Sequence, residues 1–144
     1  MQVGESFIGT GANAAHVNIV LGTRDGPVAT AWATALATPS AGHTPFVVTA
    51  HPNLPVQPFT LFVNKATIAS DRHASLTWGA AQAGVARGVI DALINELLTL
   101  PNELLLIAAV WVNPDADDDV VAAKDEISNA YFTPPADRPA ASPP

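Results

Sequence analysis

The chain has 144 residues, of which 49% are hydrophobic and only 13% are charged, and its formal net charge is −7. This length suits one domain with a substantial core. Six basic residues against 13 acidic ones leave no positive footprint for a nucleic-acid backbone or an anionic membrane, so we expect neither partner. The lack of cysteine excludes disulfides, thiol nucleophiles and zinc–thiolate sites.

The small number of charged residues also suggests that some surface is buried between subunits. The first residues, MQVGESF, lack the basic and apolar regions of a signal peptide. The longest apolar run, 104–112, is far shorter than the roughly 20 residues that a membrane-spanning helix needs. We therefore expect a cytoplasmic protein.

The first half of the chain predicts two strands, a helix and a third strand. Residues 2–9 and 14–22 alternate as strands around a glycine-containing turn. Pro27 suits the first position of a helix that ends near Pro39. Residues 45–50 are β-branched and short, which favours a strand.

The second half begins with a proline-stiffened turn that leads into a strand over 60–68. Ser70 and Asp71 are typical of a helix start, and a long helix is predicted over 79–98, with Gln82 in its first turn near the positive end of the helix dipole. Residues 104–112 predict a central strand buried on both faces. A last helix is expected from Pro114 to about residue 130.

These elements predict an α/β fold of the α+β sandwich type, with one mixed sheet and helices packed against it. We expect a single domain over 1–132, followed by a proline-rich tail over 133–144. No metal site is expected, because no two of the four histidines are three or four residues apart on a helix.

Two polar pairs interrupt the apolar pattern of the predicted strands. His16 and Asn18 point to one face of their strand, and Lys65 and Thr67 point to one face of theirs. A lysine in an otherwise apolar strand is costly unless a partner faces it. The residues alone leave two interpretations open, a polar site or an ordinary set of a core histidine, an edge lysine and surface amides.

Five segments, which carry these pairs, together resemble the formaldehyde-activating enzyme family of one-carbon metabolism: VGE at 3–5, AHVNIVLG at 15–22, PNLP at 52–55, TLFVNKATI at 60–68 and GAAQAGVA at 79–86. The resemblance runs from about residue 3 to about residue 124. It implies a fold like the second domain of ribosomal protein S5 and a homopentamer with a pterin bound between neighbouring subunits. The implied reaction condenses formaldehyde with tetrahydromethanopterin, giving the 5,10-methylene adduct and water, with no prosthetic group.

The resemblance also implies the site. The position of His16 is that of the proton donor, which suits the reaction because a carbinolamine loses water only when its hydroxyl is protonated. The pterin contacts fall on Asn18, Val47, Lys65, Thr67 and Gln82.

The pocket departs from the family pattern. Asn18 stands where the family usually has aspartate, which would favour a protonated histidine, so we predict that Asn18→Asp increases turnover. Ala83 replaces histidine, Val47 replaces leucine, and Val56-Gln57 replaces Cys-Lys. Three outcomes are open: an enzyme with altered pterin preference, a lyase for another carbonyl or amine carrier, or a non-catalytic sensor that binds formaldehyde or a pterin.

Overall fold

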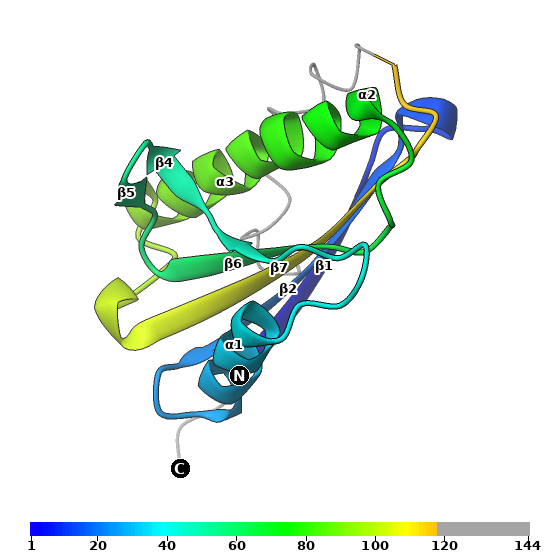
Figure 1. Cartoon of the computed structure of the whole chain (residues 1–144). Coiled ribbons are helices and arrows are strands. Elements are labelled where there is room, and N and C mark those ends of the chain that lie inside the picture. Colours follow the sequence, from blue (N-terminus) through cyan, green and yellow to red (C-terminus); the bar gives the residue numbers. More distant parts are fainter. Residues whose placement is uncertain (118–144) are drawn as a thin grey trace.

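The computed structural model describes residues 1–117, which form a five-stranded mixed sheet with helices on both faces (Figure 1). The strand order is β1-β2-β7-β6-β3. The strands are β1 Gln2–Ile8, β2 Ala15–Thr23, β7 Leu104–Val112, β6 Phe59–Asn64 and β3 Phe46–Val47. The predicted α+β class is therefore confirmed.

Strand β7 lies at the centre of the sheet, as its continuous apolar sequence predicts. It pairs antiparallel with β2 and parallel with β6. Strand β1 pairs antiparallel with β2 through the short turn η1, Gly11–Asn13. This register places Glu5 opposite Asn18 and Phe7 opposite His16.

The long helix starts earlier and ends earlier than predicted. It runs without a break through α2 Asp71–Ala74, the π-helical segment η2 Ser75–Ala81 and α3 Gln82–Ile94. The Ser70 hydroxyl caps its start by accepting a hydrogen bond from the backbone N–H of His73. Gln82 therefore lies inside a continuous helix, and the predicted position at the positive end of the dipole is wrong.

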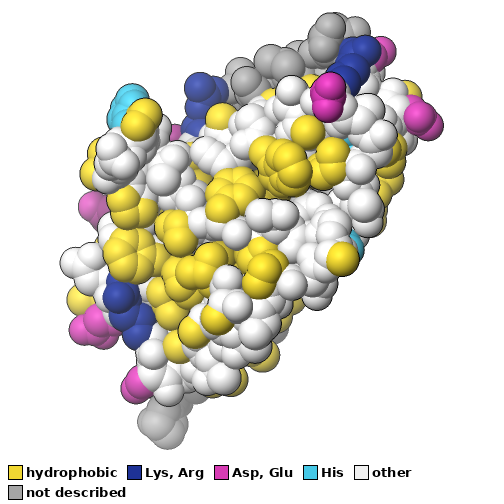
Figure 2. All heavy atoms as spheres, in the orientation of Figure 1, with side chains coloured by type: hydrophobic (Ala, Val, Ile, Leu, Met, Phe, Trp, Pro, Cys, Tyr) yellow, Lys and Arg dark blue, Asp and Glu magenta, His cyan; other side chains and the backbone are white. Residues whose placement is uncertain are grey.

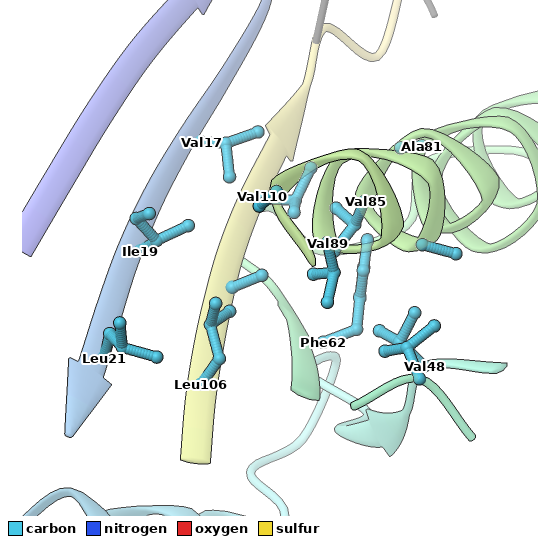
Figure 3. Packing of buried hydrophobic residues seen from close by; sticks show 14 of the residues in the cluster. Val17, Ile19, Leu21, Val48, Phe62, Ala81, Val85, Val89, Leu106 and Val110 are labelled. Carbon is cyan, nitrogen blue, oxygen red and sulfur yellow. The ribbon is translucent and has the colours of Figure 1, made fainter. Parts of the chain in front are cut away.

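Helix α3 covers one side of the sheet, which we call the core face. Val17 and Ile19 of β2 and Val110 of β7 point toward Val85 and Val89 of the helix (Figure 3). Ile94, the last residue of α3, and Leu97, which lies beyond its end, are exposed although both fall within the predicted helix.

Helix α1, Pro27–Ala37, packs on the opposite side of the sheet, which we call the outer face. Leu21 points to the core face, so its neighbour Gly22 faces the outer side. A Cβ atom at Gly22 would lie 2.5 Å from Val28 Cγ2 of the helix. Gly22 therefore permits the helix to approach one end of β2. The other end of this face carries His16 and Asn18.

Two predicted strands differ from those observed. The segment 45–50 changes partners at Val48, so that β3 joins the main sheet while β4, Thr49–His51, pairs with β5, Leu54–Pro55, in a separate hairpin. Strand β6 ends at Asn64 rather than at residue 68. The Asn64 side chain donates to the carbonyls of Gly42 and Ala66, which replaces the strand ladder with a side-chain-braced loop.

The C-terminal part of the described chain holds the last predicted elements. A short turn, η3 Pro101–Glu103, precedes β7 as the proline there suggests. Pro114 and Asp115 form a turn rather than the start of a helix, while the rest of the predicted helix and the tail over 133–144 lie outside the described residues. Within residues 1–117, no helix is long and apolar enough to cross a membrane.

Candidate functional site

The candidate site lies on the outer face, at the end of the sheet that α1 leaves open. His16 and Asn18 project from β2, and Lys65 follows β6 directly. Strand β6 ends one residue before Lys65, but Lys65 still continues along the sheet because its backbone N–H donates to the carbonyl of Val110 at 2.7 Å. His16, Asn18 and Lys65 thus start from the same sheet, whereas Thr67 lies in the loop after β6, so the predicted strand pair of Lys65 and Thr67 is wrong.

The Lys65 side chain crosses the central strand to reach β2. Strand β7 separates β6 from β2, so the ammonium must span two strand spacings, roughly 10 Å. Ala109 lies between Asn18 and Val63 in the register, and its single methyl group leaves room above the sheet.

Lys65 meets both polar residues of β2. Its Nζ donates to Asn18 Oδ1 at 2.7 Å and lies 3.1 Å from His16 Nδ1. These contacts confirm that His16 and Lys65, which are 49 residues apart in the sequence, converge.

Strand β1 adds two residues to His16. Glu5 Oε1 lies 2.7 Å from His16 Nε2, and the Phe7 ring stacks on the imidazole with centroids 3.9 Å apart and an interplanar angle of 2°. Because Lys65 can only donate, these distances fit an imidazole whose Nδ1 accepts from Lys65 and whose Nε2–H donates to Glu5. The contacts fix the histidine's orientation from three sides.

The electrostatics of the site are clearest at Glu5. The hydrogen bond with His16 holds the pKa of the Glu5 carboxyl below its usual value of 4.5, and a hydrogen bond with Asn18 lowers it further. The positive charge of Lys65 acts in the same direction. Glu5 is therefore ionised at neutral pH, and it supplies a carboxylate next to the imidazole.

The other predicted contacts lie apart from this cluster. Val47 pairs with Leu61 across β3 and β6, and Thr67 lies in the loop after β6, against Gly42. Gln82 Nε2 donates to the carbonyl of Thr49 at 3.2 Å, and Gln82 Oε1 is buried without a partner among the described residues. Since α3 covers the core face, the sheet separates Gln82 from His16 within one chain.

Glu5, Phe7 and Ala109 were not among the predicted site residues. The sequence did contain a signal for the first two, because a hairpin between the predicted strands 2–9 and 14–22 places Glu5 and Phe7 beside the histidine. The importance of Ala109 depends on strand order, which alternation does not give.

Among residues 1–117, no three His, Asp or Glu side chains lie close enough to hold a metal ion. What the cluster offers is a carboxylate, an imidazole and an ammonium in hydrogen-bonded sequence. Such an arrangement can orient a proton donor and move a proton between groups.

Known proteins resemble most of this chain. A protein named 5,6,7,8-tetrahydromethanopterin hydro-lyase from Methanosarcina barkeri is 40% identical over 119 residues, which cover 81% of this chain and 67% of that protein. Proteins named bifunctional enzyme Fae/Hps from Methanosphaera stadtmanae and Methanococcoides burtonii are 40% and 41% identical over 81% and 82% of this chain. The chain spans only 29% and 30% of the length of these two relatives.

The model of the family described as formaldehyde-activating enzyme (Fae) matches residues 3–131, which include the whole cluster from Glu5 to Lys65. With that match and the 40% identical hydro-lyase, the chain belongs to the formaldehyde-activating enzyme family.

Proposed function

We propose that this protein is a hydro-lyase that condenses formaldehyde with tetrahydromethanopterin or a related tetrahydropterin, forming the 5,10-methylene adduct and releasing water. Family membership and the similarity to a protein named tetrahydromethanopterin hydro-lyase support the reaction. The observation that carries the proposal is the 3.1 Å contact between Lys65 Nζ and His16 Nδ1, which joins two proton-exchanging groups on an exposed sheet face.

The chemistry of the reaction matches this pair. A pterin amine adds to formaldehyde to give a carbinolamine, and the carbinolamine hydroxyl leaves as water only when it receives a proton. The His16–Lys65 pair supplies that proton, and such acid assistance is typically worth about 10²–10⁴ in rate. Asn18 and Thr67 contribute polar contacts to the pterin, and Val47 an apolar one. No prosthetic group takes part in this scheme.

A homopentamer with the pterin between neighbouring subunits completes the site. Gln82 lies across the sheet from His16 in its own chain, so it joins a shared site only from an adjacent copy. Gln82 Oε1, which has no hydrogen-bond partner among residues 1–117, is an acceptor that suits an amino group of the pterin. A broad hydrophobic area, with charged side chains mainly at its margins, crosses the face in Figure 2, and burial of such an area between subunits would stabilise an oligomer.

A second candidate function is a non-catalytic protein that binds formaldehyde or a pterin on the same fold. Asn18 favours it, because the amide leaves the acceptor for Lys65 uncharged. A third candidate is a lyase that uses another carbonyl or another amine carrier. Asn18 in place of aspartate and Ala83 in place of histidine favour it, because both change the pocket.

The test compares the spontaneous and the protein-dependent rates of adduct formation. The protein is mixed with formaldehyde and tetrahydromethanopterin, and separately with formaldehyde and tetrahydrofolate. Acceleration with tetrahydromethanopterin supports the proposal. Binding of the pterin without acceleration supports the non-catalytic function, and acceleration with tetrahydrofolate alone identifies a different carrier.

A further inference from the structure

Both nitrogen atoms of His16 are already engaged within the chain. Nε2 faces the Glu5 carboxylate at 2.7 Å, and Nδ1 faces the Lys65 ammonium at 3.1 Å. The Phe7 ring covers one face of the imidazole. In this arrangement His16 has no N–H to present to the hydroxyl of a bound carbinolamine.

Lys65 has such a donor. An ammonium group carries three N–H bonds, and its two hydrogen-bond partners in the described part of the chain are His16 and Asn18. The third N–H can therefore point away from the sheet toward a ligand. Lys65 is also exposed, so a substrate oxygen can approach it.

We propose that Lys65, rather than His16, hands the proton to the departing hydroxyl. This inference rests on the proposed function. The Lys65 ammonium gives one proton to the hydroxyl, the carbon–oxygen bond breaks, and water leaves together with formation of a methylene iminium on the pterin nitrogen. The second pterin amine then attacks the iminium carbon and loses its proton to the Lys65 amine, which restores the ammonium.

Glu5, His16 and Asn18 act as positioning residues for Lys65. Glu5 accepts from His16 Nε2 and so directs the Nδ1 lone pair at the ammonium, which Asn18 Oδ1 holds from a second direction. Two fixed hydrogen bonds define the direction of the third. The cluster thus aims one N–H of a flexible side chain at the reacting atoms.

The variant Lys65→Arg tests whether the site needs the proton of Lys65 or only its positive charge. Arginine keeps the cation and can still donate to His16 and Asn18, but a guanidinium does not release its proton near neutral pH. We expect kcat to fall about 100-fold while KM stays within about threefold, since acid assistance is lost and binding is kept. The chain has one other lysine, so Lys124→Arg is the matched control and should keep the wild-type kcat.

Three further measurements keep the inference open to refutation. Circular dichroism must show that Lys65→Arg is folded. Glu5→Ala should lower kcat and weaken the signal of the His16 Nε2–H tautomer in ¹⁵N NMR spectra. Glu5→Gln should restore part of both kcat and this signal. An active wild type with an equally active Lys65→Arg overturns the inference alone, whereas an inactive wild type overturns the proposed function and this inference with it. Cyanoborohydride reduces an imine between formaldehyde and a lysine to methyl-lysine, so it tests whether Lys65 acts covalently. Methylation of Lys65 that is much faster than that of Lys124 would show an imine and would overturn the proton-donor role.

Discussion

The Glu5 carboxyl shows how neighbouring side chains change a single residue. Its pKa is held below 4.5, first by the hydrogen bond with His16 and then by the one with Asn18, although the carboxyl lies on the surface. Because the pKa in the folded state is below that in the unfolded state, this contact contributes stability that is complete above pH 4.5. The contribution is lost as the pH falls through the lower, folded-state pKa.

Thermal unfolding as a function of pH tests this effect. Wild-type protein should have a higher Tm than Glu5→Gln at pH 6, and the difference should shrink toward pH 3 as the carboxyl is protonated in both states. Glu103→Gln is the matched control, because Glu103 is exposed on η3 and has no hydrogen bond with His16. A constant difference in Tm between wild type and Glu5→Gln across this range would contradict the assignment.

Asn18→Asp has two expected effects. The carboxylate keeps the acceptor for Lys65 and turns this contact into a charge-assisted hydrogen bond that positions the ammonium more firmly, so turnover is expected to rise. It also removes the amide that hydrogen-bonds Glu5 and places a second negative charge there, so the pKa of Glu5 should move back up toward 4.5. Carboxyl NMR titration and steady-state kinetics measure the two effects, and an unchanged or lower kcat would refute the electrostatic role of this position.

Among the elements, β2 and α1 depend on one glycine. A side chain at Gly22 would collide with the Val28 side chain, whereas a Cβ atom at Gly79 would have no heavy atom within 4 Å outside its own helix. The difference follows from packing, since Val28 is buried at 3% exposure and Gly79 is exposed.

Gly22→Ala should therefore destabilise the fold by about 1–3 kcal/mol, the usual cost of overpacking. Gly79→Ala should be neutral or stabilising by up to about 1 kcal/mol, because alanine favours a helix over glycine. Combining Gly22→Ala with Val28→Ala should recover part of the loss, which a double-mutant cycle by urea unfolding measures. Equal effects of the two glycine substitutions would contradict the packing account.

The elements also show how far local pattern reaches. Alternation predicted β1 and β2, a continuous apolar run predicted β7, and the common face of His16 and Asn18 follows directly from the alternation. The end of β6 was predicted four residues late because the Asn64 amide, which bonds loop carbonyls from two segments, acts through tertiary contacts. The predicted helix start was wrong because the π-helical segment joins two stretches that look separate in sequence.

At the scale of the whole molecule, the position of Gln82 requires a second subunit if it contributes to the site. We expect a mass in solution of five times the chain mass of 14.9 kDa at micromolar concentration. His16→Ala and Gln82→Ala should each have strongly reduced activity alone. When they are co-expressed in equal amounts, about a quarter of the shared sites should combine one intact half from each subunit.

Recovery of activity in the mixed oligomers would support a site between subunits. A folded monomer, or mixed oligomers with no activity when each homo-oligomer is also inactive, would contradict it. The S5-like arrangement implied by the resemblance likewise stays a prediction, since what the described residues confirm is the mixed five-stranded sheet.

The sequence by itself determined the faces of the strands, the α+β class and the family, because these depend on local periodicity and on the types of residue at fixed spacing. It could not determine that Lys65 reaches His16, since this depends on a strand order in which β7 alone separates β6 from β2. The hairpin of the first two predicted strands already places Glu5 beside His16, but only the tertiary structure decided that Lys65 takes the second imidazole nitrogen, because a contact between residues 49 apart depends on strand order and not on local pattern.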